Sequence, residues 1–294
     1  MKTLSLYRPC AIAVLVMVSA VPAVAQTNQS LEPRKDASDA AFTTKLVKTG
    51  LYSISSGGSN SLLRLSQNGL IIVDGKQTGN YDLLLARIRK ISDQPIRVVV
   101  LPDAHAGSNA EFLADGAGII VQENARRNLA TSASDFIEGT APPQIVTYDR
   151  EYKLRMGGVD AQLLHFGNAH TNGDTVVYFP NLKVVAVGDL FAYTPDPDFS
   201  AGGSLVGWGP VLGEILKLDF TVAIPGTGPA IARADLEAFK SKIDTLIFRA
   251  TQLVKAGVPK DRLMAELKTD DLGWQFSFAG PKLDSFYAEL SGTK

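Results

Sequence analysis

The apolar positions in the first half of the chain change from a strand-like to a helical pattern. Short β-type runs come first, separated by glycine turns, at residues 51–54, 61–65 and 70–73. Asn68-Gly69, between the last two runs, is typical of a hairpin. Leu84, Ile88 and Ile91 then recur at helical spacing until Pro95 stops the pattern. Beyond this point the pattern predicts alternating elements, with strands at 96–101 and 118–121 and helices at 109–115 and from residue 124.

The second half repeats this organisation. Strands are predicted at 161–166, 175–179 and 184–187, and a long amphipathic helix at 232–256. Gly257 and Pro259 end that helix. Two strand-rich halves that are each covered by helices predict an α/β fold with four layers, αββα, in which two mixed β-sheets lie face to face. We expect residues 42–294 to form this single domain.

One long segment has no clear period. Residues 191–213 are rich in glycine, proline and aspartate and run from Phe191 through Trp208. A long irregular segment in a compact domain is often functional, and a simple surface excursion is an equal alternative.

The N-terminal segment has the pattern of an export signal. Lys2 and Arg8 supply positive charge, residues 11–18 are an unbroken apolar run, and Ala23-Val24-Ala25 is a small-x-small cleavage site. We therefore expect residues 1–25 to be a signal peptide, residues 26–41 to be a flexible polar leader, and the protein to be periplasmic or secreted. No later stretch approaches the roughly 18 consecutive apolar residues of a spanning helix, so no membrane anchor is expected after cleavage.

Charge and cysteine content exclude several classes of partner and site. The formal net charge of -1 supplies no basic field, so nucleic acid and anionic membranes are poor partners, whereas a small-molecule ligand or substrate remains open. The only cysteine, Cys10, lies in the predicted signal peptide. The mature chain would therefore have no disulfide, thiol nucleophile or cysteine-ligated zinc.

All three histidines lie in or beside two segments that look like metal-site loops. Residues 98–109 contain His105 before Gly107-Ser108-Asn109, and residues 167–175 contain His170. Gly188-Asp189-Leu190 and Pro225-Gly226-Thr227-Gly228 follow, and an Asp74-Gly75 turn precedes them all. In this order the segments resemble the metallo-β-lactamase-fold hydrolases, from Gly50 to the C-terminus. The resemblance implies the αββα fold and a dinuclear zinc site.

The resemblance also implies that most ligands of that site are lost. The first loop of such hydrolases reads His-x-His-x-Asp-His, and counting back from Asn109 only His105 matches it. His170 matches a zinc-binding histidine, and Asp189 matches the carboxylate that bridges the two metals. The lost ligand positions are Val100, Pro102, Ala104 and Thr227. Each metal would keep two ligands, fewer than the three or four that zinc uses.

Two functions therefore remain open. In the first, the protein is a pseudoenzyme or ligand-binding protein with a degenerate site, with no zinc or weakly bound zinc, and the residual His105, His170 and Asp189 persist as hydrogen-bonded residues. In the second, it is a metal-dependent hydrolase of esters, thioesters, lactams or lactones that uses the same three residues in a remodelled zinc site. A shifted loop would then turn Asp103 inward as a substitute ligand.

The remaining histidine and two aspartates are expected to be structural. His165 lies on the apolar run 163–166 and is predicted to be a core or edge residue. Asp74 and Asp174 are predicted to serve turns, because aspartate readily accepts hydrogen bonds from neighbouring backbone amides.

Overall fold

The computed structural model describes residues 42–75, 81–105, 107–131 and 145–292. The signal peptide predicted at 1–25, with Cys10, and the leader predicted at 26–41 lie outside these residues. All described residues fall in one compact unit that spans residues 34–294. Within the described ranges, no helix has the length and apolar character needed to cross a membrane.

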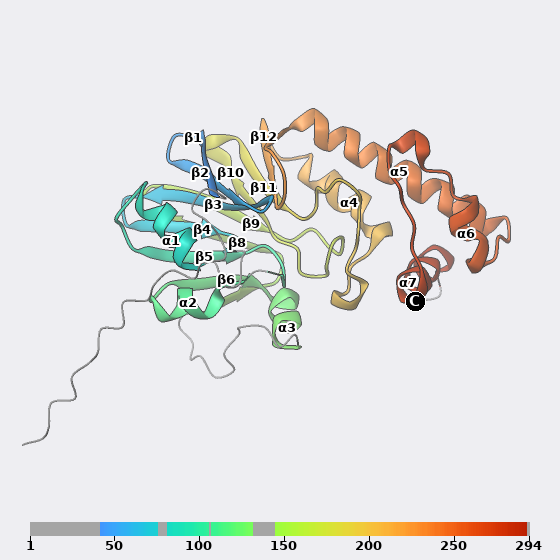
Figure 1. The fold of residues 1–294 in the computed structure, drawn as a ribbon, viewed down its shortest axis with the longest axis horizontal. Helices are drawn as coiled ribbons and strands as arrows, with labels where there is room; N and C mark the ends of the chain where they lie inside the picture. Colours follow the sequence, from blue (N-terminus) through green and yellow to red (C-terminus); the bar gives the residue numbers. More distant parts are fainter. Residues whose placement is uncertain (1–41, 76–80, 106, 132–144, 293–294) are drawn as a thin grey trace, which may run out of the picture. The chain divides into compact units, whose positions relative to one another are not determined.

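The first sheet has seven strands in sequence order (Figure 1). They are β1 (Phe42–Lys48), β2 (Leu51–Ser56), β3 (Ser59–Ser66), β4 (Gly69–Val73), β5 (Ile96–Leu101), β6 (Gly118–Gln122) and β7 (Ile145–Tyr148). Strands β1 to β4 pair antiparallel, and β4 to β7 pair parallel. Parallel neighbours need crossover connections, and three helices lie in these connections, α1 (Tyr81–Arg89), α2 (Asn109–Ala114) and α3 (Glu123–Thr131).

The second sheet has six strands in the order β13-β12-β11-β10-β9-β8. Their bounds are β8 (Glu151–Met156), β9 (Val159–Leu164), β10 (Val176–Phe179), β11 (Val184–Gly188), β12 (Val222–Pro225) and β13 (Ile231–Ala232). The helices of this half are α4 (Leu205–Ile215), α5 (Arg233–Lys255), α6 (Lys260–Glu266) and α7 (Gly280–Ser291). Short 3₁₀ turns occur at Pro180–Leu182, Phe199–Ala201 and Asp270–Leu272.

Strand β5 shows how the layers form. Val99 and Leu101 face outward and share an apolar cluster with Ile88 of α1 and Phe112 of α2. Val100 faces the other way, into a cluster between the two sheets that also contains residues of β9 to β12. A third cluster joins the outer face of the second sheet to α4 and α5. This arrangement confirms the predicted four-layered αββα fold.

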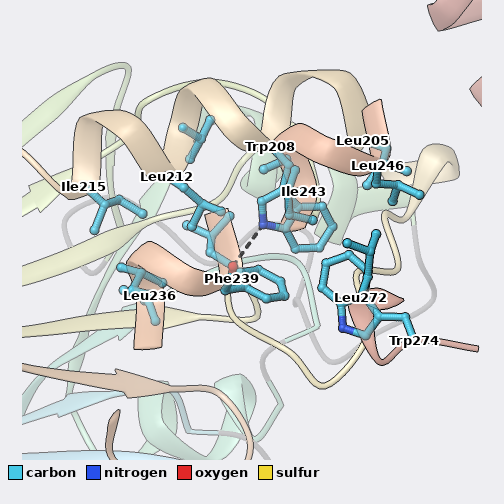
Figure 2. Packing of buried hydrophobic residues seen from close by; sticks show 14 of the residues in the cluster. Leu205, Trp208, Leu212, Ile215, Leu236, Phe239, Ile243, Leu246, Leu272 and Trp274 are labelled. Atoms are coloured by element: carbon cyan, nitrogen blue, oxygen red, sulfur yellow. Dashed lines mark hydrogen bonds between the residues drawn. The ribbon is translucent and has the colours of Figure 1, made fainter. Parts of the chain in front are cut away.

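The elements named from the pattern agree with the structure to within about two residues at each end, with one correction. The segment 191–213 is irregular only as far as Ser204, because α4 begins at Leu205. Three glycines and Pro210 hide its period in the sequence. Its burial reveals it, since Trp208, Leu212 and Ile215 are fully buried against Leu236 and Ile243 of α5 (Figure 2).

Candidate metal centre

Four side chains from three loops gather where the strands of the two sheets end. Asp103 and His105 follow β5, His170 lies between β9 and β10, and Asp189 follows β11. One potential ligand atom of each, an imidazole nitrogen or a carboxylate oxygen, lies within 4.8 Å of those of all the others. The structure thus brings together the three residues expected from the motifs and Asp103, the residue expected only if the loop was shifted.

The loop after β5 turns Asp103 inward. Its side chain is 2% exposed, and its Oδ1 accepts a hydrogen bond from the His105 backbone amide at 2.7 Å. Such a bond closes a tight turn of the kind aspartate favours. The His105 Nδ1 lies 3.5 Å from the same oxygen. Beyond the loop, Ser108 adopts a left-handed conformation with φ of 60° immediately before α2.

The charge around His105 is strongly acidic. The hydrogen bond to Asp103 raises the pKa of His105 to about 9, against the opposing effect of burial. On the other side of the ring, His105 Nε2 lies 3.2 Å from Asp198 Oδ2. Burial raises the pKa of the Asp198 carboxyl, but hydrogen bonds from Ser200, the Ala201 amide and His105 outweigh it and lower that pKa overall. Without a metal, the site therefore holds an imidazolium between two carboxylates.

The loop that carries His170 is braced by Asp174. The Asp174 carboxylate accepts hydrogen bonds from the Thr171 amide at 2.9 Å and from the Thr171 hydroxyl at 2.6 Å. His165 binds the backbone of the same loop, with its Nδ1 2.9 Å from the Asp174 carbonyl oxygen. Asp174 thus serves a turn, as expected, and His165, expected as a core or edge residue, lies outside the four-residue cluster.

A hydrogen bond at Nδ1, the ring nitrogen directed away from the cluster, orients His170. Its Nδ1 lies 3.0 Å from the carbonyl oxygen of Asp196, so this nitrogen donates and carries the proton. The other nitrogen, Nε2, faces the cluster at 3.8 Å from Asp189 Oδ2. Ring centroids of His105 and His170 are 5.2 Å apart. A histidine ligand commonly donates its second ring proton to a carbonyl or carboxylate, which fixes the tautomer.

The irregular segment before α4 lies behind both histidines. It supplies the Asp196 carbonyl to His170 and the Asp198 carboxylate to His105. Backbone hydrogen bonds join the two loops, from the Asp198 amide to the His170 carbonyl and from the Ser204 amide to the Ala169 carbonyl, each at 2.8 Å. Sequence reasoning singled out this segment but not Asp196 or Asp198, and the Pro-Asp-Pro-Asp run was the available signal.

The positions where ligands are lost offer no second site. Val100 is fully buried between the sheets, and Pro102 lines a small cavity between them. Ala104 packs against the outer apolar cluster. Thr227 forms a β-bridge with Ser59, in a loop whose Pro225 and Gly228 carbonyls accept hydrogen bonds from the Asn60 side chain.

The four donors lie close enough together to share one metal ion. Zinc takes ligand atoms at about 2.0–2.2 Å, which puts tetrahedral ligands roughly 3.3–3.6 Å apart. The separations of 3.5 Å between His105 and Asp103 and of 3.8 Å between His170 and Asp189 approach this spacing. Two imidazoles and two carboxylates suit zinc, and also manganese or iron.

Comparison with known proteins places the chain by its fold. No family model matches its sequence. The chain is 23% identical over 226 residues to the 2,4-dinitroanisole O-demethylase subunit alpha of Nocardioides sp. (strain JS1661), covering 75% of this chain and 68% of that protein.

Solved structures assign the fold from geometry. A metallo-β-lactamase from Pontibacter korlensis matches with a TM-score of 0.59 at 18% identity, over 69% of this chain and 99% of that one. FIM-1 from Pseudomonas aeruginosa, in its mono-zinc form, matches with a TM-score of 0.59 at 17% identity, over 69% of this chain and 95% of that one. The chain has the metallo-β-lactamase fold.

Proposed function

We propose that the protein is a hydrolase that depends on a single metal ion, held by Asp103, His105, His170 and Asp189. One observation carries this proposal: four potential ligand atoms from three separate loops lie within 4.8 Å of one another. Asp103 supplies a carboxylate one residue before the Ala104 position from which the resemblance expects one. The remodelled set therefore replaces a degraded dinuclear site with a complete mononuclear one.

The solved relatives support a single ion in this fold. FIM-1 is described in a mono-zinc form, so a neighbour with the same fold holds one zinc. In this chain Val100 and Pro102 stand where histidines would complete the first metal position, and neither side chain offers a ligand atom. One ion is the stoichiometry that the donors support.

The chain's own residues would orient the site and hold its protons. A bound metal of this type supplies Lewis acidity and lowers the pKa of a coordinated water to about 7. The Asp196 carbonyl holds the proton on His170 Nδ1, which leaves Nε2 directed at the cluster. The Asp198 carboxylate accepts a hydrogen bond from His105 Nε2 and would hold that proton on the ring, which leaves Nδ1 on the side of Asp103.

We propose the substrate class from the resemblance and from the sequence relative. Esters, thioesters, lactams and lactones are the bonds that the fold resemblance implies. The name of the sequence relative, a 2,4-dinitroanisole O-demethylase subunit, adds an alkyl–oxygen bond to the substrates worth testing.

We also propose that the protein acts outside the cytoplasm, on the pattern of residues 1–25 alone. Intact-mass measurement of exported material tests this by showing whether Gln26 is the first residue.

A second candidate function is a non-catalytic metal-binding or ligand-binding protein. Catalytic zinc sites keep three protein ligands and one water, whereas four protein ligands close a tetrahedral site. The four-residue cluster favours this alternative if all four bind zinc at once. A metal that takes six ligands, such as manganese or iron, would leave open positions on the same residues.

Activity assays separate the two candidates. Metal-stripped mature protein is reloaded with zinc, manganese or ferrous iron and assayed with nitrophenyl esters, a thioester, nitrocefin, a lactone and 2,4-dinitroanisole. The proposal expects turnover of at least one substrate that depends on added metal and is lost in His170→Ala, whereas Asp196→Asn, which keeps the backbone carbonyl, retains it. Metal binding without turnover of any substrate would favour the non-catalytic alternative.

A further inference from the structure

A pocket of about 320 Å³ is lined by none of the four residues of the candidate metal centre. Its walls come from the loop after β11 (Phe191, Tyr193), from α5 (Asp235, Phe239, Lys242) and from Trp274 after the last 3₁₀ turn. This volume falls within the range of small-molecule sites, which are mostly apolar with a few placed polar groups.

The deep wall of the pocket is a fixed aromatic surface. Phe191 and Phe239 have ring centroids 4.9 Å apart, and Phe239 meets Trp274 edge to face at 5.7 Å. Phe239 and Trp274 are 5% and 4% exposed, and Figure 2 shows both side by side. Because packing holds these rings in place, the wall is preformed for another flat ring.

Tyr193, at the rim of the pocket, has an aromatic side chain that is largely exposed to solvent. Tyr193 is 87% exposed, the largest exposed fraction among the large hydrophobic residues that the structure describes. An aromatic ring buries a large apolar surface when it is covered, and offset or edge-on contact with another ring adds to that gain. A planar ligand against Phe191 and Phe239 would give Tyr193 such a contact.

Two charged residues line the pocket, and Lys242 supplies its positive charge. Its ammonium group lies over the Trp274 ring, 5.6 Å from the centroid, and within the described part of the chain no ion pair joins it to a carboxylate. Three other cations of α5 are paired, Arg233 with Glu237, Lys240 with Asp244 and Arg249 with Asp271. Asp235 lies two helical turns away, where its carboxylate accepts a hydrogen bond from the Ala232 amide at 2.8 Å. The cation at one end of the pocket is thus the group available to a ligand.

We propose that this pocket binds a small planar aromatic anion, with the ring between Phe191, Phe239 and Tyr193 and the anionic group at Lys242. Binding does not depend on a metal. Phe191 is two residues from Asp189, so at most about 7 Å of chain separates the pocket wall from the metal cluster.

Calorimetric titration of metal-stripped mature protein tests the pocket independently of any hydrolase activity. The probes are 2-naphthoate, its neutral amide 2-naphthamide, and cyclohexanecarboxylate, which keeps the charge without the aromatic ring. The variants are Lys242→Gln and Tyr193→Ala. Matched controls on α5 are Lys255→Gln and Phe248→Ala, an exposed cation and an exposed aromatic residue that do not line this pocket.

We expect 2-naphthoate to bind at least tenfold more tightly than either analogue. Lys242→Gln should remove the preference over the amide, and Tyr193→Ala should weaken binding of both naphthyl probes several-fold, while both controls leave binding unchanged. Because the Tyr193 side chain is exposed, we expect Tyr193→Ala to fold as the wild type does. This variant therefore tests the pocket even if Lys242→Gln is unstable. Absence of 2-naphthoate binding, or binding that neither pocket variant alters, overturns the proposal.

Discussion

His105 Nε2 and Asp198 Oδ2 lie 3.2 Å apart although 93 positions separate the two residues in the sequence. The contact joins the loop after β5 to the irregular segment before α4. The other ring nitrogen of His105, Nδ1, lies 3.5 Å from Asp103 Oδ1, so the imidazole is held between two carboxylates. A carboxylate behind a histidine ligand fixes its tautomer and increases its basicity.

We therefore predict that Asp198→Asn weakens metal binding by roughly 10- to 100-fold, the usual effect of losing such a partner. A competition titration against a zinc chelator measures this. Asp196→Asn is the matched control, because Asp196 acts on His170 through its backbone carbonyl and its side chain pairs only with Lys282 among described residues. Equal affinity in Asp198→Asn and the wild type would show that Asp198 does not support the site.

The second prediction concerns the brace of the His170 loop. Asp174→Ala leaves the buried amide and hydroxyl of Thr171 without their acceptor, and each lost partner of this kind costs about 1–3 kcal/mol. Because two partners are lost, we expect the free energy of unfolding to fall by roughly 2–6 kcal/mol, measured by urea denaturation. Asp160→Asn, which removes an exposed pair with Arg155 at 3.8 Å, should change it by less than about 0.5 kcal/mol. Equal losses of unfolding free energy in Asp174→Ala and Asp160→Asn would contradict the bracing role of Asp174.

The third prediction is a pH dependence of the metal-free protein. Burial raises the pKa of Asp174 to about 8 from 3.8, against the hydrogen bonds from Thr171. A carboxyl whose pKa is raised on folding stabilises the protein most below its unfolded pKa, and this contribution is lost as pH rises towards the folded pKa. The stability of the wild type relative to Asp174→Asn should therefore decrease between about pH 4 and pH 8. A difference that stays constant or grows over this range would show that Asp174 is ionised in the folded protein.

Strands buried on both faces were the most predictable part of the fold. The run at 96–101 is continuously apolar because β5 packs outward on helices and inward on the second sheet. Helix α4 was not recognised, because its glycines and Pro210 disrupt the apolar period although its Trp208 face is buried. Strand β8 was also missed, since at the edge of its sheet it buries only Leu154.

The candidate site was predictable only where a motif names the residue. His105, His170 and Asp189 follow from motif order. Asp103 was recognised only as a substitute that required a shifted loop, and the hydrogen bond between its carboxylate and the His105 amide is what turns it inward. The Pro-Asp-Pro-Asp run marks Asp198 as a candidate, but its contact with His105 could not be predicted, because no spacing rule relates residues that meet through the packing of two distant loops.

The metal content of purified mature protein, measured by mass spectrometry after reloading with zinc, tests the central claim most directly. The account predicts about one equivalent per chain, reduced to a small fraction in both Asp103→Ala and His170→Ala and retained in Asp196→Asn. Two equivalents, no bound metal, or one equivalent that survives Asp103→Ala would contradict a single site built from Asp103, His105, His170 and Asp189.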